Sequence, residues 1–285
     1  MATILLPLDG SHFAEQAIPH ALGRLGPADE LYLIQAVEPP PSLMLLETIL
    51  PEEDMTGSQA YLDGLAERLR QRNFQVRAKL FLGSARETIL SVAEREKPAL
   101  VVVASHGRTG IRRWLLGSVA ESVVRMAPCP VWLVRCEQPP EGYDASQQPL
   151  PALNRVLVPL DTSERAYGAI DFVIRTVPKA ATVILMAATN MNWLASTDAL
   201  GEVVAQVRAA LDERAARLRA EGFTVEVVMD PGTPADAILD IAAARQVDAI
   251  MMTSHGRTGA ERMFLGSVTE KVVRHSPCPV AVVRG

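Results

Sequence analysis

The sequence has few cysteines, no long apolar run and no excess of basic residues, and each shortage argues against a class of protein. Three cysteines in 285 residues form no CxxC or Cys/His zinc pattern, and their odd number argues against a disulfide framework. No apolar run approaches the roughly 18 residues of a membrane span, and the first residues lack the basic and apolar regions of a signal peptide. A net charge of −5 argues against nucleic acid as the main partner, because phosphate backbones are bound by clustered basic residues. These shortages predict a cytoplasmic protein that binds neither nucleic acid nor membrane.

What is abundant is apolar sequence in short runs. A hydrophobic share of 48% beside 21% charged residues is typical of a globular chain and excludes disorder. Cys129 and Cys278 stand in identical Pro-Cys-Pro contexts before apolar runs, so we expect them to be small buried hydrophobic residues rather than redox centres.

A duplicated segment organises the chain. Residues 104–118 (ASHGRTGIRRWLLGS) return 149 positions later as residues 253–267 (TSHGRTGAERMFLGS), and ILLPLD at 4–9 is echoed by VLVPLD at 156–161. Such self-similarity predicts two copies of one domain. The expected boundaries are domain 1 at residues 1–137, a Pro-, Gln- and Ser-rich linker at 138–152, and domain 2 at 153–285.

Within each copy, short apolar runs alternate with longer amphipathic stretches. In the first copy we expect strands near 3–8, 30–37, 75–82, 99–104 and 130–135, and helices near 12–25, 57–72, 85–96 and 118–127. Near-continuous apolar runs such as 100–103 and 249–252 are typical of strands buried on both faces. The alternation predicts an α/β protein with two tandem, doubly wound, parallel five-stranded sheets.

Helix-start signals support this alternation. Ser84, Ser118 and Ser267 each precede a glutamate by three residues, which is the capping-box pattern, and Thr233 precedes a proline in the N-cap and first-turn pattern.

Candidate ligand-binding residues fall where the first and fourth strands of each copy end. Asp9 and Asp161 close the first strands, and glycine-containing loops that lead into helices follow the fourth strands. In open α/β sheets ligands bind beyond the carboxyl ends of the strands. Loop and helix N–H groups would hold phosphates, and the carboxylate would accept hydrogen bonds from ribose hydroxyls. The loop residues with candidate roles are Gly107, Arg108, Gly110, Gly117 and Ser118 in the first copy, and Gly256, Arg257, Gly259, Gly266 and Ser267 in the second.

Each of these residues also has a structural interpretation. The glycines permit a turn, Ser118 and Ser267 suit helix N-caps, Asp9 suits the cap of the next helix, and the arginines suit exposed surface. Ser105 and His106 invite a nucleophile–base interpretation. However, adjacent Ser and His do not normally face each other, and no orienting acid or G-x-S-x-G pattern accompanies them.

Standard nucleotide and protease motifs are missing from the sequence. It contains no G-x-x-x-x-G-K-[ST], no G-x-G-x-x-G after a first strand and no HExxH. Without a phosphate-loop lysine or an evident Mg²⁺ carboxylate pair, the site is better suited to holding a nucleotide than to cleaving one.

The loop spacing resembles that of the universal stress protein family, in a tandem arrangement that covers nearly all of both halves. Its ATP-binding members carry G-x-x-G, nine residues and G-[ST]. Here Gly107 and Gly256 are each followed by nine residues and then by Gly-Ser. The first motif glycine is replaced by Ala104 in one half and Thr253 in the other, so the first site is expected to fit a nucleotide better.

The resemblance implies an adenine nucleotide α hydrolase-like, Rossmann-like fold, ATP with or without Mg²⁺ as ligand, no enzymatic activity and a role in the stress response. It also implies that fifth strands pair, here residues 131–135 with 280–284, which gives an intrachain pseudo-dimer and leaves a further homodimer open. The additional lining residues that it implies are Pro7, Val37, Val103 and Val119 in the first half, and Pro159, Ala188, Met252 and Val268 in the second.

Two other functions stay open from the sequence: a protein-interaction module that binds no nucleotide, and slow ATP hydrolysis. The loop at 38–56, with three consecutive prolines followed by an apolar run, suits a lid, a surface for another chain or a packed connection.

Overall fold

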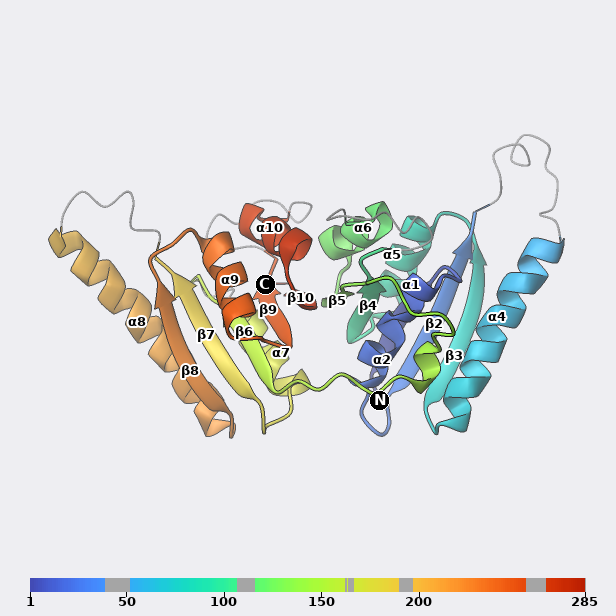
Figure 1. Ribbon diagram of the computed structural model, residues 1–285, viewed down its shortest axis with the longest axis horizontal. Helices are drawn as coiled ribbons and strands as arrows, with labels where there is room; N and C mark the ends of the chain where they lie inside the picture. The colour runs from blue at the N-terminus through green and yellow to red at the C-terminus, as the bar shows by residue number, and fades with distance from the viewer. Residues whose placement is uncertain are drawn as a thin grey trace. The chain divides into compact units, whose positions relative to one another are not determined.

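The computed structural model describes residues 1–38, 52–106, 116–161, 163, 167–189, 197–254 and 265–284, with only the backbone at 52–54 and 197–200. These residues form two compact units, 1–151 and 152–285, and Figure 1 shows strands and helices alternating along each of them.

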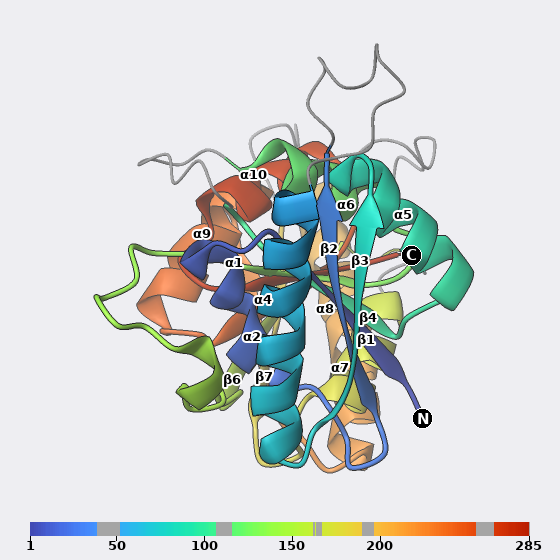
Figure 2. The ribbon, with the colours of Figure 1, turned by 90° about the vertical axis from the view of Figure 1, so that its right-hand side faces the viewer.

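The first unit is a parallel sheet with the strand order β3-β2-β1-β4-β5. Its strands are β1 Thr3–Leu8, β2 Glu30–Val37, β3 Gln75–Leu82, β4 Leu100–Ala104 and β5 Val131–Val134. Its helices are α1 His12–Glu15, α2 Ala17–Leu22, α4 Glu52–Gln71, α5 Ala85–Glu96 and α6 Ser118–Met126. Figure 2 shows α1, α2 and α4 on one side of this sheet and α5 on the other.

The second unit repeats this arrangement with the order β8-β7-β6-β9-β10, again parallel. Its strands are β6 Arg155–Pro159, β7 Thr182–Ala188, β8 Thr224–Asp230, β9 Ala249–Thr253 and β10 Val280–Val283. Its helices are α7 Tyr167–Thr176, α8 Thr197–Ala220, α9 Pro234–Ala244 and α10 Ser267–His275. The predicted fold class of two doubly wound α/β domains is confirmed.

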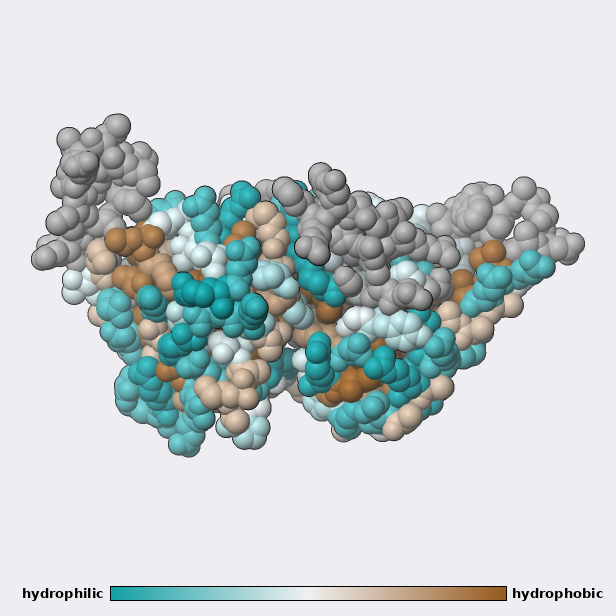
Figure 3. Space-filling model, turned by 180° about the vertical axis from the view of Figure 1, so that it is seen from behind, coloured by the Kyte–Doolittle hydropathy of each residue, from teal (hydrophilic) through white to brown (hydrophobic). Residues whose placement is uncertain are grey.

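Consecutive strand residues are buried in both units, which is the mark of a sheet covered on both faces. Leu5 and Leu6 are each 0% exposed, and so are Leu157 and Val158. Since neighbouring side chains on a strand point to opposite faces, each face must be covered by helices. On the face seen in Figure 3, hydrophilic residues are interspersed with smaller apolar areas.

Two of the predicted helix caps are displaced by one residue. Gly117 and Gly266, not the serines that follow them, are the N-caps of α6 and α10, in extended conformation. Ser118 and Ser267 are therefore the first helical residues, and the prediction that they cap is wrong. Extended glycine is readily accommodated at this position, where Gly117 N donates to Ser105 O (2.8 Å) and its carbonyl accepts from Glu121 N (2.8 Å).

The remaining helix starts agree with the sequence patterns. Ser84 is the N-cap of α5, although its side chain makes no capping hydrogen bond. Thr233 is the N-cap of α9 with Pro234 in the first turn, and the Thr233 hydroxyl donates to Asp236 (2.6 Å).

The segment after β5 packs against the first unit. Gln16 bonds Glu137 twice, its Nε2 donating to the carbonyl (2.7 Å) and its Oε1 accepting from the amide (3.1 Å). A short 3₁₀ helix, Ala145–Gln147, follows, and Arg24 donates to the Pro151 carbonyl (3.0 Å). Ser146 is fully buried, so the segment expected to be a linker has a structured part.

Candidate functional site

The first unit has a pocket of about 270 Å³ at the carboxyl ends of β1 and β4, between the starts of α5 and α6. It brings together six of the predicted site residues: Pro7, Asp9, Val103, Gly117, Ser118 and Val119. They come from three separate parts of the chain, and the parallel order β1-β4 places their strand ends side by side.

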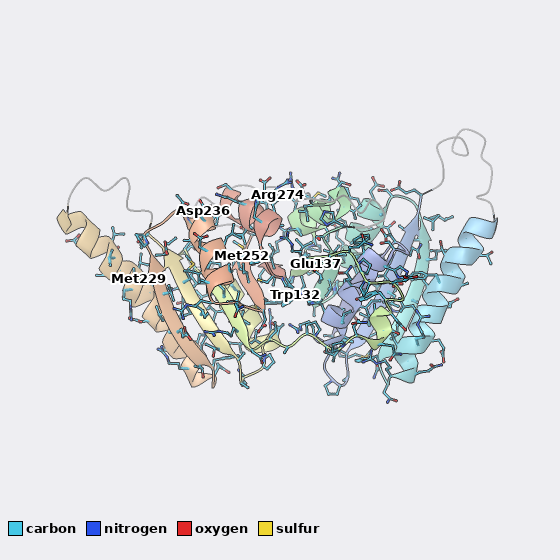
Figure 4. All side chains as sticks on the ribbon, viewed as in Figure 1. Trp132, Glu137, Met229, Asp236, Met252 and Arg274 are labelled. Carbon is cyan, nitrogen blue, oxygen red and sulfur yellow. The ribbon has the colours of Figure 1, made fainter. Side chains whose placement is uncertain are left out.

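The second unit has a matching pocket of about 300 Å³ at the ends of β6 and β9. Seven predicted residues line it: Pro159, Asp161, Ala188, Met252, Gly266, Ser267 and Val268. Met252 lies on β9 and is labelled in Figure 4, as is Asp236 near the start of α9. The same pocket therefore occurs twice, once in each unit.

Both aspartates sit in the same local turn. Asp9 Oδ1 accepts from Ser11 N (3.0 Å) and Ser11 Oγ (2.6 Å), and Asp161 Oδ1 accepts from Ser163 N (3.1 Å) and Ser163 Oγ (2.7 Å). Such Asx turns fix the carboxylate. The cap of α1 is Ser11, whose hydroxyl accepts from Ala14 N (3.2 Å), so the alternative role of Asp9 as the helix cap is wrong.

The second carboxylate oxygen of Asp161 shows what the pocket lacks. Asp161 Oδ2 is buried and has no hydrogen-bond partner among the residues that the structure describes. An unpaired buried acceptor costs about 1–3 kcal/mol. A ligand hydroxyl in the pocket is the kind of donor that would satisfy it.

Opposite each aspartate lies a helix N-terminus. Ser118 and Ser267 are exposed first residues of nine-residue helices and line the two pockets. The first N–H groups of a helix lack intrahelical acceptors and carry the positive end of the helix dipole. Each pocket thus pairs a hydroxyl-accepting carboxylate with an anion-binding helix end.

Six predicted loop residues lie outside the described part of the chain: Gly107, Arg108, Gly110, Gly256, Arg257 and Gly259. Most of the 38–56 loop, residues 39–51, does as well.

The strand register shows that Val37 does not match Ala188. Pro7 pairs with Ile34, and Pro159 pairs with Met186. Ala36 lies two residues after Ile34 on β2, and Ala188 lies two residues after Met186 on β7. Ala188 lines its pocket, whereas Val37 ends β2, where its carbonyl accepts from Gly83 N (3.0 Å).

The two positions that lack the motif glycine are accommodated differently. Ala104 is 7% exposed and lies on the wall of its pocket. Thr253 also lines its pocket, and its carbonyl accepts from Thr269 Oγ1 (3.2 Å), a hydroxyl that Ala120 lacks in the first unit. The second pocket therefore carries an extra β-branched side chain.

Sequence reasoning missed one wall of each pocket. Ala85 and Ile89 from α5 line the first pocket, and Pro234 and Ile238 from α9 line the second. The sequence did show where α5 and α9 begin, directly after the third strand of each unit. Because the carboxyl ends of parallel strands all lie at the same edge of the sheet, the first turns of these helices could have been expected near the pocket.

Ser105 and His106 do meet, contrary to expectation. Ser105 Oγ lies 3.0 Å from His106 Nδ1 and also accepts from Cys136 N (3.2 Å). Ser105 is only 7% exposed, and no carboxylate among the described residues bonds the imidazole. The pair thus ties the end of β4 to β5 and lacks the third member of a triad.

None of the three cysteines is in a disulfide, and all are half-buried, so Cys129 and Cys278 are less buried than predicted. Burial raises the pKa of the Cys136 thiol, whose Sγ lies 3.3 Å from the Phe13 carbonyl. Within the described ranges, no three His, Cys, Asp or Glu side chains converge to hold a metal ion. None of the helices described is both long and apolar enough to cross a bilayer.

Comparison with known proteins agrees with the duplication. The sequence model of the universal stress protein family matches residues 1–135 and again 152–284. The chain is 33% identical over 141 residues to universal stress protein MJ0531 of Methanocaldococcus jannaschii, covering 46% of this chain and 81% of that protein. It is 30% identical over 219 residues to universal stress protein Rv2005c of Mycobacterium tuberculosis, covering 75% and 70% respectively.

Among solved structures, a universal stress protein from Archaeoglobus fulgidus is similar over 99% of this chain and 98% of its own, with a TM-score of 0.67 at 23% identity. That likeness concerns the fold. The two matches of the family model, together with the repeated α/β units, show that this chain belongs to the universal stress protein family.

Proposed function

We propose that each unit binds one adenine nucleotide, ATP, in its strand-end pocket, and that nucleotide occupancy serves a role in the cellular stress response in the cytoplasm. The observation that carries the proposal is the duplicated site. Asp9 and Asp161 are held by the same serine turn, and each lines a pocket that also contains the N-terminus of a nine-residue helix.

Each group in the pocket has a match in the nucleotide. The carboxylate of Asp9 would accept hydrogen bonds from ribose hydroxyls, since an ionised carboxylate only accepts. Pro7 and Ile89 would provide apolar contacts to the base. The N–H groups and hydroxyl at Ser118 would receive phosphate oxygens.

Magnesium would enter with the phosphates. The described residues bring together no ligand set of three carboxylate or imidazole groups, and Mg²⁺ is commonly bound through one or two carboxylates plus substrate phosphates. We therefore expect Mg²⁺ to modulate affinity without a site of its own.

We propose binding without rapid turnover. Fast phosphoryl transfer needs a positioned cation at the phosphates and a group that orients the nucleophile. The sequence has no phosphate-loop lysine, and the Ser105–His106 pair is mostly buried and lacks an acid. The nucleotide would then act as a bound ligand.

Calorimetric titration of the whole chain with ATP, with and without Mg²⁺, tests the proposal. GTP is the control for recognition of the adenine base. We expect saturable ATP binding at two sites per chain and weaker GTP binding. Absence of binding at about 1 mM ATP would contradict the proposal. A dissociation constant of that size corresponds to a binding free energy of roughly −4 kcal/mol.

One observation favours a second candidate, a protein-interaction module without nucleotide. Thr253 places a β-branched side chain on the wall of the second pocket, where the family's ATP-binding pattern has glycine. If this candidate holds, ATP will leave the second unit empty, and Gly266→Val will leave partner binding unchanged.

We also propose that residues 131–135 pair with residues 280–284, which would remove one of the two open edges of each sheet. Spin labels at Arg135 and Arg284 would then lie within about 20 Å, since paired strands are about 4.8 Å apart. A broad distribution of longer distances would contradict the pairing.

A further inference from the structure

The first unit contains a second, more open cavity of about 380 Å³ that Asp9 also lines. It lies where β1 and β2 end beside α4, whereas the nucleotide pocket is bounded by α5 and α6. Figure 2 shows α4 and α5 on opposite sides of the sheet. Asp9 lines both cavities, so the two adjoin at this residue.

Gln35 gives this cavity a polar wall that is not fully paired. The side chain is 2% exposed, and its Nε2 donates one long hydrogen bond to Ser58 Oγ on α4 (3.3 Å). Its Oε1 is buried without a partner among the described residues. Burying an amide acceptor in this way costs about 1–3 kcal/mol, and hydrogen bonding to a bound molecule would recover part of that.

Tyr61 adds an oriented acceptor. Its hydroxyl donates to Glu15 Oε1 (2.9 Å), and the other oxygen of Glu15 lies 3.0 Å from His12 Nδ1. Burial, with the charge of Glu15 as a second cause, raises the pKa of Tyr61. Because the phenolic proton is engaged by a carboxylate that is itself 7% exposed, the oxygen of Tyr61 has lone pairs left to accept a hydrogen bond.

The second unit shows that the fold does not require these polar groups. Buried Leu62 and Leu69 of α4 correspond to Leu211 and Leu218 of α8, at the same 149-residue offset. On this alignment and the strand register, the residues in place of Gln35, Ser58 and Tyr61 are Ala187, Val207 and Ala210. The polar cavity is thus a feature of the first unit.

The lining chemistry indicates the kind of ligand. Asp9 disfavours an anion, and no cationic side chain lines the cavity within the described residues. The lining still offers both kinds of hydrogen-bonding group, because Ser58 Oγ and the second proton of Gln35 Nε2 can donate, while Gln35 Oε1 and the Tyr61 oxygen can accept. The hydroxyls of a sugar donate and accept in the same way. We infer that the cavity bounded by Asp9, Ser11, Gln35, Ser58 and Tyr61 is a binding site for a small neutral polyhydroxyl compound, a sugar or a polyol.

Saturation-transfer NMR on the full chain tests this with myo-inositol and D-glucose as probes. Gln35→Ala/Ser58→Val installs the residues of the second unit, and Ser58→Val alone is the milder variant should the double change unfold. Gln59→Ala is the matched control, because it removes an amide from the same helix whose bond is to Asp63 (3.0 Å), away from the cavity.

We expect at least one probe to bind saturably with a millimolar dissociation constant. This constant should rise at least about tenfold in the double variant and severalfold in Ser58→Val. Binding should persist in Gln59→Ala and in the presence of ATP, and ATP affinity should be unchanged in all three variants. The inference is overturned if neither probe saturates by about 50 mM, if Ser58→Val binds like wild type, or if ATP displaces the probe. ATP affinity is read separately, so failure here leaves the nucleotide proposal standing.

Discussion

Ser11 holds Asp9 with two hydrogen bonds, from its amide (3.0 Å) and from its hydroxyl (2.6 Å), both to the same carboxylate oxygen. The turn therefore engages one oxygen of Asp9 and orients the carboxylate at the edge of the pocket. The second unit repeats the relationship with Ser163 and Asp161, which suggests that the carboxylate orientation matters in both pockets.

Ser163→Ala should weaken ATP binding in the second unit by about tenfold or more, since one hydrogen bond to a charged group contributes about 1.5–3 kcal/mol. The amide bond to Asp161 remains, so the turn should persist. The dissociation constant for ATP, measured by calorimetry, reports this effect. Ser146→Ala removes the same kind of bond from Asp144 (2.6 Å) away from both pockets, and an equal loss of affinity in that variant would argue against the account.

Gly117→Val should harm the first unit more than Gly266→Val harms the second. A Cβ on Gly117 would lie 3.1 Å from the Ser105 carbonyl oxygen, whereas one on Gly266 would lie 3.4 Å from that of Ser254. Since the tighter contact is with backbone, we expect Gly117→Val to lose about 1–3 kcal/mol of unfolding free energy. Urea unfolding compares the two variants, and equal losses would show that the contact is unimportant.

Thr253→Gly should strengthen ATP binding in the second unit by about fivefold, or ~1 kcal/mol. The change removes a β-branched side chain from the pocket wall and leaves the carbonyl that accepts from Thr269 in place. Calorimetry should show the gain in the weaker of two sites. Thr224→Gly, at the exposed start of β8, is the control for introducing a glycine into a strand. An unchanged ATP affinity in Thr253→Gly would show that Thr253 is not part of the site.

Acid should destabilise the protein through His20. Burial, followed by the charge of Arg24, lowers the pKa of His20 from 6.5 to about 4. Between these values the unfolded chain binds the proton and the folded chain does not, so the contribution is complete above pH 6.5 and is lost as the pH falls toward 4. The loss approaches about 3 kcal/mol.

Urea unfolding at pH 7.5 and pH 4.5 measures this loss. His20→Gln should reduce the difference between the two pH values by about 2–3 kcal/mol. His275→Asn, at an exposed position, should behave like wild type. A wild-type pH dependence in His20→Gln would show that other groups cause the acid sensitivity.

The sequence predicted the sheet and about half of the residues that line the two described pockets, because apolar strand runs and the repeat can be recognised in the sequence alone. Asp9 comes directly after a buried apolar run, and the repeat placed its counterpart Asp161, whereas Pro7 was implied by the family resemblance. The helix walls formed by Ile89 and Ile238 were missed, since their contact with the pocket depends on how a helix crosses the sheet.

Single-residue offsets were the other source of error. Ser118 fits the capping-box pattern, yet the extended conformation of Gly117 makes that glycine the cap. Val37 was matched to Ala188, but hydrogen-bond register, which sequence spacing does not fix, makes Ala36 the equivalent residue.

The stoichiometry of ATP binding tests the central claim most directly. The proposal predicts two sites per wild-type chain, one in Asp9→Ala, one in Asp161→Ala and none in the double variant. Asp144→Ala removes an equivalent Asp–Ser turn outside the pockets and should keep both sites. Unchanged ATP binding in the double variant, or loss of a site in Asp144→Ala, would contradict the account.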